Sequence, residues 1–382
     1  MFKQWSLFFR HISSVVSFFQ LPNEKRRIVF YSEGKAYWVH LAALLEQTLA
    51  ADQVDVCYIS SDEHDPGLSV QHPRLLTFKI DEGWVRNWLF ENIETEVMVM
   101  TMPDLHQYQV KKSRFPVNYV YTQHSMVSLH MVYRPGAFDH FDTVFCSGPH
   151  HVAEMRAIEA RDELAPKTLV EHGYPRLDSI LANSSVVVRS TSATDNVEVL
   201  LAPSWGKHSI TDTVAMELIG IVLAAGFRLT YRPHPQSQKF SADKIDEIVA
   251  SYGCHDSFEI EFDVSSEDSL HRSQLMICDW SGAALDYAFG LGKPVVFIDV
   301  PKKVNDPAYL AIAVEPFEVS IRKRIGCVLE VEELRGLPEK ITQLLNRDMS
   351  DEIMKIRNEC IFNVGCSGEA GAQDLLNLLS RK

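Results

Sequence analysis

Five short polar segments each follow a predicted strand, and they hold the residues best suited to chemistry. The segments are Thr122-Gln123-His124-Ser125, Gly173-Tyr174-Pro175-Arg176-Leu177-Asp178, Ala202-Pro203-Ser204-Trp205, Arg232-Pro233-His234-Pro235 and Asp279-Trp280-Ser281-Gly282. In open α/β sheets, ligands bind in the crevice outside the carboxyl ends of the strands. The positions of these segments therefore predict an enzyme that handles a nucleotide.

The last segment has the features of a phosphate-binding helix start. Ser281 and Gly282 open a predicted helix, where free backbone N–H groups and the positive end of the helix dipole attract anions. A serine at this position is, taken alone, more often an ordinary N-cap. Arg232 and His234 favour the phosphate interpretation, because two prolines stiffen the strand end that presents them and Arg prefers bidentate phosphate contacts. The residues expected to bind the donor substrate are Ser204, Arg232, Asp279, Ser281 and Gly282.

His124 is the natural candidate for a general base. An imidazole with a pKa near the reference value of about 6.5 can accept a proton from an attacking hydroxyl at neutral pH. The chain has 15 histidines, so local sequence does not single out His124. The pair His150-His151 lacks further ligands at metal spacing, and no Asp-x-Asp pair is present to hold a divalent metal on a diphosphate. We therefore expect transfer without a metal.

Strand-like and helix-like segments alternate along the chain. Runs of β-branched and aromatic residues predict strands at 28–32, 54–60, 96–101, 117–123, 143–147 and 168–171, and again at 197–202, 228–232, 258–262, 275–278 and 294–299. Helical spacing occurs at 38–50, 211–225 and 283–289. This alternation predicts mostly parallel sheets.

Length and composition predict two domains. A single hydrophobic core stops growing at about 250 to 300 residues, and this chain has 382 residues, of which 46% are hydrophobic. The polar segment 182–196 is the predicted linker. We expect an acceptor domain at 26–185, a nucleotide-donor domain at 197–350, and a helical segment at 351–382 that could cross back to the first domain. The predicted fold class is α/β, with two Rossmann-like domains facing each other across a cleft.

Charge and cysteine content narrow the class of protein. The balance of 37 basic and 51 acidic residues gives a net charge of -14, and no long Lys/Arg run is present. This excludes nucleic acid as an expected partner, because its binding depends on positive charge. The seven cysteines are scattered and form no Cys-x-x-Cys pair, which is typical of reduced thiols in the cytoplasm.

Residues 1–25 predict an amphipathic helix. Large apolar residues recur at helical spacing, and residues 1–27 carry five basic residues against one acidic residue, a local charge of +4. The polar face argues against a membrane-spanning helix, and no cleavage site typical of a signal peptide follows. Two interpretations stay open: the helix binds the inner face of the cytoplasmic membrane, which we slightly favour, or it packs its aromatic side on the first domain.

The motifs together resemble those of the CDP-glycerol glycerophosphotransferase family, which includes teichoic-acid primases and polymerases. The matching motifs are Tyr121-Thr122-Gln123-His124, Gly173-Tyr174-Pro175-Arg176-x-Asp178, Ala202-Pro203-x-Trp205, Arg232-x-His234-Pro235, Asp279-x-Ser281 with Asp286 downstream, Lys293-Pro294 and Phe362-Asn363-x-Gly365-x-Ser367-x-Glu369. They occur in the family's order over about residues 115 to 375. The first hundred residues agree only at the level of fold.

The resemblance implies a GT-B-type fold and a specific reaction. Members transfer a polyol phosphate from a CDP-polyol, such as CDP-glycerol, to a hydroxyl of a lipid-linked acceptor and release CMP, in the synthesis of cell-envelope polymers such as teichoic acid or capsule. By this resemblance His124 is the catalytic base, His234 is a second catalytic histidine near the donor, and Ser281 with Gly282 contacts the donor diphosphate. Arg176, Arg232 and Asp286 are further substrate-binding residues. It implies no cofactor, a place at the inner face of the membrane, and a chain that could form homo-oligomers.

The sequence also departs from the family pattern beside these residues. Ser125 replaces the glycine that the family usually has after the histidine. The chain has Asp279-Trp280-Ser281-Gly282 where the family has Asp-Tyr-Ser-Ser, and Trp205 is followed by Gly-Lys where the family has Arg. These departures bear on the identity of the donor, so alternatives remain. They are a GT-B glycosyltransferase with a nucleotide-sugar donor, a nucleotide-sugar epimerase of the same architecture, and a catalytically silent scaffold.

Overall fold

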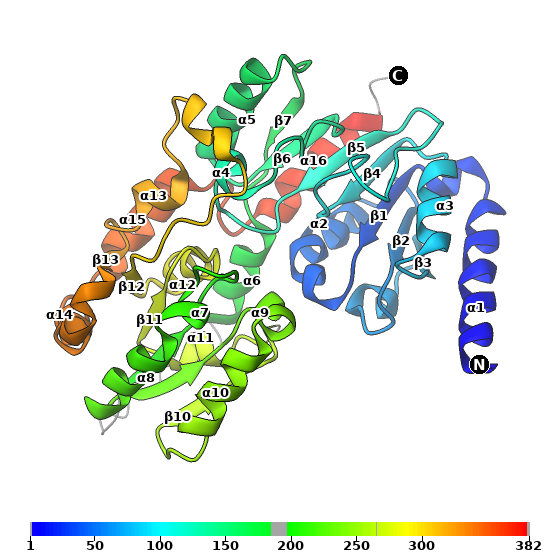
Figure 1. Cartoon of the computed structure of the whole chain (residues 1–382). Helices are drawn as coiled ribbons and strands as arrows, with labels where there is room; N and C mark the ends of the chain where they lie inside the picture. The colour runs from blue at the N-terminus through cyan, green and yellow to red at the C-terminus, as the bar shows by residue number, and fades with distance from the viewer. Residues whose placement is uncertain (1, 185–196, 265, 380–382) are drawn as a thin grey trace. The chain divides into compact units, whose positions relative to one another are not determined.

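The structure is a computed structural model that describes residues 2–184, 197–264 and 266–379 (Figure 1). The contacts among these residues divide the chain into two compact units. The first unit contains Met1–Asp178, Ala308–Val314 and Ile361–Lys382, and the second contains Ser179–Pro307 and Glu315–Cys360.

The first unit is built on a parallel sheet, which has seven strands within the described residues, in the order β3-β2-β1-β4-β5-β6-β7. The strands are β1 (Ile28–Ser32), β2 (Val56–Ser60), β3 (Leu75–Lys79), β4 (Val97–Met100), β5 (Asn118–Thr122), β6 (Thr143–Cys146) and β7 (Thr168–Glu171). β1 lies at the centre, where Phe30 pairs with Tyr58 of β2 and with Val99 of β4. The central strands are apolar and fully buried, as expected of a parallel sheet covered on both faces.

Helices from both ends of the chain cover this sheet. They are α1 (Phe2–Phe19), α2 (Trp38–Ala50), α3 (Trp84–Asn92), α4 (Leu129–Val132), α5 (Pro149–Arg161) and α16 (Ser367–Leu379). Figure 1 shows α16, in red, among the blue and cyan elements, and it packs on α2. The backbones approach so closely that a Cβ atom on Gly368 would lie 2.7 Å from the carbonyl oxygen of Ala43. Leu375 of α16 and Leu44 of α2 belong to the same buried core.

The second unit repeats this design with a parallel sheet of six strands within the described residues, in the order β10-β9-β8-β11-β12-β13. Its strands are β8 (Glu198–Leu201), β9 (Arg228–Tyr231), β10 (Phe258–Ile260), β11 (Leu275–Cys278), β12 (Val295–Ile298) and β13 (Gly326–Leu329). Its helices are α7 (Ile210–Thr213), α8 (Ala215–Ala224), α9 (Pro235–Phe240), α10 (Ala242–Tyr252), α11 (Asp268–Arg272), α12 (Ala283–Leu291), α13 (Phe317–Ile321), α14 (Leu337–Leu345) and α15 (Ser350–Cys360).

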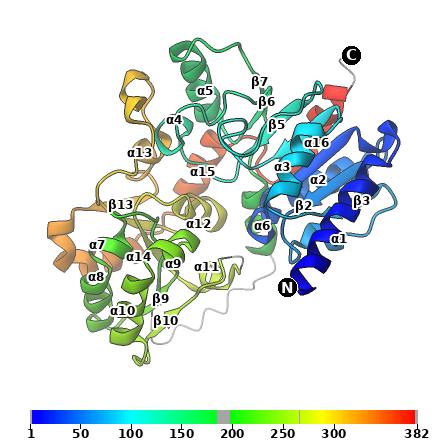
Figure 2. The ribbon, with the colours of Figure 1, turned by 45° about the vertical axis from the view of Figure 1, so that its right-hand side comes forward.

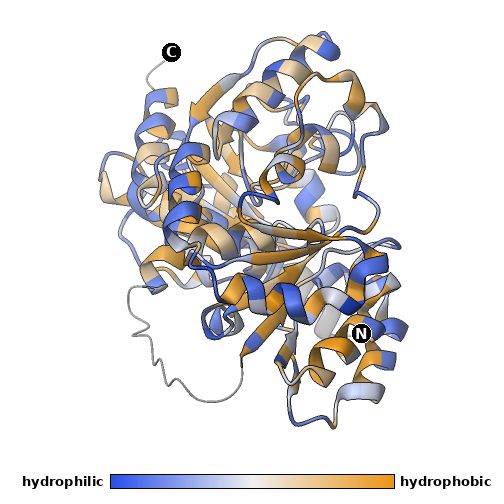
Figure 3. Ribbon diagram, turned by 90° about the vertical axis from the view of Figure 1, so that its left-hand side faces the viewer, coloured by the Kyte–Doolittle hydropathy of each residue, from blue (hydrophilic) through white to orange (hydrophobic). Residues whose placement is uncertain are grey.

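Both sheets confirm the predicted α/β class. Each has the strand order 3-2-1-4 at its centre, the order of doubly wound nucleotide-binding sheets, so each has a switch point where neighbouring connections leave in opposite directions. In Figure 3 the strands are mostly orange, the colour of hydrophobic residues. β3 and β13, which the sequence did not predict, are the additional strands. All seven cysteines lie within the described residues, and none of them forms a disulfide.

The chain passes between the two units after Asp178 and again before Ile361, with a short return to the first unit at Ala308–Val314. Helix α6 (Pro175–Ser184) carries the chain out of the first unit, and the division falls after Asp178. Most of the predicted linker, residues 185–196, lies outside the described residues. The predicted helical segment 351–382 contains two helices, α15 in the second unit and α16 in the first, and the chain re-enters the first unit at Ile361.

Asp178 ties the end of the first stretch of the first unit to the segment that returns to this unit at Ile361. Its carboxylate accepts hydrogen bonds from the backbone N–H of Gly365 (2.7 Å) and from the backbone N–H and hydroxyl of Ser367 (2.8 and 2.5 Å). Gly173 has a φ of 95°, and a Cβ there would lie 2.5 Å from the carbonyl oxygen of Phe362. The motifs Gly-Tyr-Pro-Arg-x-Asp and Phe-Asn-x-Gly-x-Ser therefore meet, and part of each serves to join the returning chain to the first unit.

The described part of α1 packs on the first unit, as Figure 2 also shows for α1, α3 and β3. The Phe18 ring meets Phe78 of β3 edge-on, and Phe19 meets Trp88 of α3 in the same way, each with 5.5 Å between ring centroids. The Arg26 guanidinium lies 5.9 Å from the Phe18 ring centroid. Within the described residues, no helix is both long enough and apolar enough to span a bilayer.

Candidate functional site

The first unit places His124 at the carboxyl edge of its sheet. His124 follows β5, Thr101 follows β4, and Glu33 begins the connection after β1, so these residues lie around the switch point. Buried polar atoms without a hydrogen-bond partner among the described residues collect here, namely Thr101 Oγ1, Thr122 Oγ1 and both amide atoms of Gln123. Buried polar groups are normally paired, so such a group marks a place where a ligand or water completes the bonding.

The hydrogen bonds of His124 define which nitrogen can act as a base. Its Nδ1 lies 3.1 Å from the carbonyl oxygen of Thr101 and 3.0 Å from the Tyr121 hydroxyl. A carbonyl oxygen only accepts, so Nδ1 carries the proton and Nε2 keeps its lone pair. The Tyr121 hydroxyl can donate onward to Tyr133 at 3.3 Å. Burial lowers the pKa of His124 to about 4, against the opposing effect of the Thr101 bond, so the ring is neutral at pH 7.

Aromatic and imidazole rings surround His124. The ring centroids of Tyr133, Tyr37 and His40 lie 5.8, 6.1 and 6.3 Å from that of His124. The Tyr174 hydroxyl donates to the carbonyl oxygen of His124 at 3.1 Å, which fixes the backbone at this position. These contacts hold the His124 ring in one place, as a general base requires.

His40 and Arg176 belong to the same neighbourhood. His40 is buried, and burial followed by the charges of Arg176 and His124 keeps its pKa well below the usual range. Arg176, in the first turn of α6, is therefore close enough to act on this group electrostatically. Sequence reasoning predicted Arg176 but missed His40, whose position on an apolar helical stretch gave no signal.

Glu33 is a second titratable group that the sequence did not reveal. Burial raises its pKa to about 7, with Arg86 opposing and Glu82 adding to the rise. Glu33 also contributes to the raised pKa values of Tyr37 and Tyr121. A strongly perturbed carboxyl at a sheet switch point is typical of functional sites.

The second unit places the predicted donor-binding residues at the carboxyl edge of its own sheet. Ser204 follows β8, His234 follows β9, and Ser281 and Gly282 follow β11 at the start of α12. The Ser281 hydroxyl accepts from the Ala283 N–H at 3.3 Å, and Gly282 is the N-cap residue of α12. Asp286 is buried in the first turn of α12. This geometry fits the predicted phosphate site at the helix N-terminus.

Asp279, which the sequence predicts to bind the donor substrate, uses its carboxylate on backbone groups of the protein. Its side chain is 1% exposed. One carboxylate oxygen accepts from the Ser204 and Trp280 N–H groups, at 2.7 and 2.6 Å, and the other accepts from the Ile210 N–H at 2.9 Å. Asp279 thus binds backbone groups and fixes the loop after β8 against the loop after β11.

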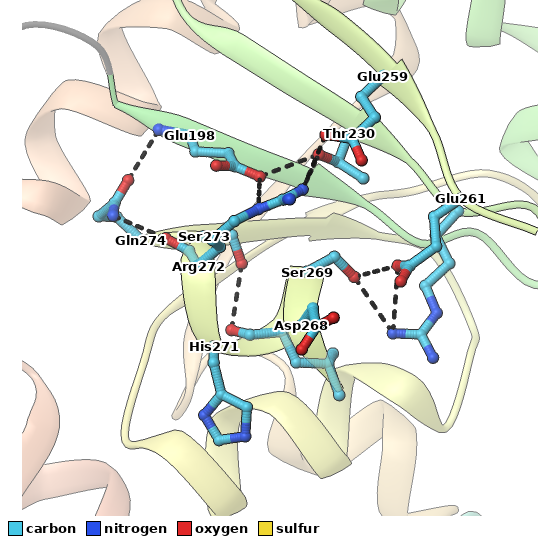
Figure 4. Close-up of polar contacts among 12 residues, drawn as sticks. Glu198, Thr230, Glu259, Glu261, Asp268, Ser269, His271, Arg272, Ser273 and Gln274 are labelled. Carbon is cyan, nitrogen blue, oxygen red and sulfur yellow. Dashed lines mark hydrogen bonds and ion pairs between the residues drawn. The ribbon is translucent and has the colours of Figure 1, made fainter. Parts of the chain in front are cut away.

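Arg232, which the sequence predicts to bind a phosphate, likewise binds groups of the protein. It is buried and donates to the carbonyl oxygens of Val264 (2.5 Å) and Ser266 (2.9 Å) and to the Ser269 hydroxyl (3.3 Å). Ser269 in turn contacts Glu261, a contact drawn in Figure 4. In the structure, the Arg232 guanidinium therefore donates to protein oxygens, whereas the sequence predicts that it donates to a phosphate.

A second arginine network in Figure 4 is structural. Arg272 binds Glu198 of β8 and Glu259 of β10, each at 2.9 Å, and Thr230 of β9 at 3.2 Å. Glu198 begins its strand, so this network lies toward the amino edge of the sheet and joins neighbouring strands there. It is separate from the residues at the carboxyl edge.

His234 is held in the opposite way to His124. It caps α9, and its Nδ1 accepts from the Gln236 N–H at 3.1 Å. Nδ1 is therefore unprotonated, and the neutral ring carries its proton on Nε2. Burial, followed by the charge of Lys303, lowers the pKa of His234 to about 3. At neutral pH this side chain is a hydrogen-bond donor through Nε2.

Trp205 and Lys303 complete this region. The Trp205 ring stacks on Phe240 with centroids 6.2 Å apart and lies 6.1 Å from the His234 ring. The Lys303 Nζ lies 4.3 Å from the Trp205 ring centroid. Sequence reasoning missed Lys303, and its place just after β12 was the available signal. Among the described residues, no group of three or more His, Cys, Asp or Glu side chains could hold a metal ion.

Comparisons with known proteins agree with these features. The sequence profile described as CDP-Glycerol:Poly(glycerophosphate) glycerophosphotransferase matches residues 14–303, which is more than half of the chain. The match includes His124, His234 and Ser281 and ends before the Phe362-Asn363 motif. No curated protein matches the chain in sequence.

Solved structures share the fold. The wall teichoic acid polymerase TagF is similar with a TM-score of 0.59 at 15% identity, over 100% of this chain and 99% of that chain. The UDP-GlcNAc 2-epimerase of Methanocaldococcus jannaschii gives a TM-score of 0.56 at 12% identity, over 93% and 99% of the chains. The sucrose-phosphate synthase of Thermosynechococcus elongatus gives 0.55 at 14% identity, also over 93% and 99%. At these identities the similarity concerns the fold alone, and it confirms the expected GT-B-like α/β architecture.

The family match covers strands β1 to β12 and includes both histidines whose geometry is described above. The chain belongs to the CDP-glycerol:poly(glycerophosphate) glycerophosphotransferase family and is a transferase.

Proposed function

We propose that this protein transfers a polyol phosphate, of which glycerol phosphate is the first candidate, from a CDP-alcohol to a hydroxyl of a membrane-linked polymer acceptor, with release of CMP. The observation that carries the proposal is the state of His124. Its Nδ1–H bond to Thr101 leaves a neutral Nε2 lone pair at the carboxyl edge of the first sheet. The family membership supplies the class of reaction.

In this reaction the first unit activates the acceptor. The acceptor hydroxyl gives its proton to His124 Nε2, and its oxygen attacks the β-phosphorus of the donor. The bond between the β-phosphorus and the oxygen that bridges to the α-phosphorus breaks, and CMP leaves. General-base catalysis of this kind contributes about 10²- to 10⁴-fold to the rate.

The second unit binds the donor in this proposal. The N-terminus of α12, with Ser281 and Gly282, holds phosphate oxygens through backbone N–H groups and a hydroxyl. His234 donates Nε2–H to the oxygen that leaves with CMP. Positioning and electrostatic stabilisation supply most of the acceleration in phosphoryl-type transfer, and in this proposal the helix N-terminus and His234 contribute both.

The test is an assay of CMP release by the purified full-length protein. CDP-glycerol, CDP-ribitol and UDP-sugars are compared as donors, with membranes as the acceptor. The His124→Ala protein is the loss-of-function variant, and His64→Ala, at an exposed histidine, is the matched control. Release of CMP from a CDP-polyol that only His124→Ala abolishes supports the proposal.

Other results of this assay point to the competing functions. Turnover of a UDP-sugar alone makes the protein a glycosyltransferase that uses a nucleotide sugar. Turnover of no donor, with nucleotide still bound, makes it a silent scaffold. CMP release that is unchanged in His124→Ala removes His124 as the base while keeping the reaction.

Contact with the cytoplasmic face of a membrane is a further part of the proposal. Val16 on α1 and Trp84 and Trp88 on α3 are 47%, 64% and 42% exposed, and α1 packs against α3, so these apolar side chains belong to adjoining helices. Exposed tryptophans beside a basic segment are typical of binding to anionic lipid surfaces.

Flotation with vesicles of phosphatidylglycerol and phosphatidylethanolamine tests the membrane contact. The expected result is that wild-type protein floats and Trp84→Ser protein does so less. Leu310→Ser, at a residue that is 78% exposed, is the control and should float like wild type. Equal flotation of all three proteins, or of none, contradicts a membrane role for this surface.

A further inference from the structure

Lys303 presents a positive charge that the protein does not neutralise locally. Its side chain is partly buried, and its Nζ lies over the Trp205 ring, 4.3 Å from the centroid. Among the described residues, no oxygen accepts a hydrogen bond from this Nζ and no carboxylate lies within ion-pair distance. A partly buried ammonium with only an aromatic face as partner is poorly satisfied, because it has lost water without gaining an acceptor.

The residues around Lys303 are those of the candidate donor region. Lys303 interacts electrostatically with His234 and with Asp279. Asp279 uses its carboxylate oxygens on backbone N–H groups, so it attracts Lys303 only from a distance. The Lys303 loop follows β12, the Trp205 loop follows β8 and His234 follows β9, which brings three strand ends of one sheet to the same place.

The chemistry of this place favours an anion. Its polar groups at neutral pH are an ammonium with unused N–H donors and the Nε2–H donor of His234, both beside an aromatic ring. Phosphate oxygens accept from such donors in strong, charge-assisted hydrogen bonds. Burial lowers the pKa of Lys303 to about 8, so the group is mostly charged at pH 7 and an anion that binds to it stabilises the charged form.

We propose that Lys303 binds a phosphate oxygen of the nucleoside diphosphate part of the donor, next to His234. The inference rests on the proposed function, since it names a residue for the donor site of that reaction. Lys303 acts in binding and not as the base. Its position over Trp205 also orders the aromatic surface beside the phosphates.

The experiment measures binding of CDP, UDP and cytidine to the full-length protein by isothermal titration calorimetry. The variants are Lys303→Gln and Lys303→Arg, and Lys302→Gln at the exposed neighbouring residue is the matched control. Loss of a charge-assisted hydrogen bond predicts that Lys303→Gln weakens CDP binding by about 10- to 100-fold. Lys303→Arg restores most of the affinity, Lys302→Gln matches wild type, and cytidine affinity is the same in all four proteins.

Two outcomes overturn the inference. Equal CDP affinity of Lys303→Gln and wild type removes Lys303 from the phosphate site. Equal losses for CDP and cytidine make Lys303 a support for the Trp205 ring and not a phosphate ligand. Melting temperatures of the variants separate a binding defect from unfolding, and Lys303→Arg, which keeps the charge over the ring, provides a second independent comparison.

Failure of the proposed function gives a different pattern. Wild type that binds UDP and not CDP argues against a CDP-alcohol donor, and a loss of UDP affinity in Lys303→Gln still supports the inference. Wild type that binds no nucleotide overturns the inference as well.

The pH dependence of binding adds a further measurement: CDP affinity of wild type falls as the pH rises through about 8, and Lys303→Arg lacks this fall. Of the facing groups, His234 stays neutral in that range because burial lowers its pKa to about 3, and the Asp279 carboxylate is held by backbone N–H groups.

Discussion

Two histidines, one in each unit, are partly buried and held in opposite tautomers. His124 donates from Nδ1 to a carbonyl oxygen, which leaves Nε2 free to accept a proton. His234 accepts at Nδ1 from a backbone N–H, which leaves a proton on Nε2 to donate. The difference comes from one backbone group in each case, a C=O after β4 and an N–H in the first turn of α9. It teaches that local backbone geometry, and not residue type, assigns base and donor roles.

Loss of the base should have the largest effect on activity. His124→Gln removes the basic nitrogen while keeping a polar side chain of similar size. Since general bases contribute about 10²- to 10⁴-fold, we expect kcat to fall by at least about 100-fold. Steady-state CMP release measures this, with His64→Ala as the control. If kcat of His124→Gln falls by less than a few-fold, His124 is not the base, and the contrast in role between His124 and His234 is wrong.

Substitution of His234 by asparagine separates capping from donation. Asparagine is a preferred N-cap, so its side-chain oxygen can replace Nδ1 in the bond to Gln236, but it lacks a donor at the position of Nε2. We expect a loss of about 10- to 100-fold in kcat/KM for the donor with little change in melting temperature. His234→Ala, which removes both functions, should also lower the stability by about 1 kcal/mol. Equal activity of His234→Asn and wild type shows that only the cap matters.

A second comparison between the two units concerns how much one buried or partly buried carboxylate in each contributes to stability. Asp279 and Asp178 each accept several hydrogen bonds, but Asp279 is fully buried in the second unit and Asp178 is partly exposed in the first. An amide at either position turns one acceptor into a donor that faces an N–H. We expect Asp279→Asn to cost about 2 to 3 kcal/mol of unfolding free energy and Asp178→Asn about 1 kcal/mol. Urea denaturation measures both, and the reverse order contradicts the assignment.

The pH dependence of the rate should show the smallest effect. Protonation of His124 removes its lone pair, and its pKa is lowered to about 4. The value of kcat/KM should therefore stay level from pH 7 down to pH 5 and decline only as the pH approaches 4. A rate profile in mixed buffers measures this. A midpoint near the ordinary histidine value of about 6.5 means that water reaches the ring in the working enzyme.

The sequence predicted the central strands well, because buried parallel strands are continuous apolar runs. β1, β7 and β11 match the predictions to within a residue at each end. The strands that were missed, β3 and β13, both lie at the edge of a sheet and are only partly buried, so they lack such a run. β7 and β10 are also edge strands with partial burial, and they were predicted, so edge position alone does not account for the two omissions.

The candidate site was predictable only to the level of which strand ends carry it. His124, His234 and Ser281 follow their strands as expected because strand ends can be placed from the apolar pattern. The engagement of Arg232 and Asp279 within the protein depends on partners more than 30 residues away in sequence. Lys303 was missed for the same reason, since its significance comes from the distant Trp205 ring.

The packing of α16 on α2 has a consequence for the synthesis of the protein. The strands and helices of the first unit up to Asp178 are made first, but the helix that covers α2 is made about 200 residues later. At a translation rate of about 5 to 20 residues per second, this delay lasts roughly 10 to 40 seconds. During that time the apolar surface around Leu44, which α16 later covers with Leu375, lies open. The nascent first unit is thus a substrate for chaperones until its last helix emerges from the ribosome.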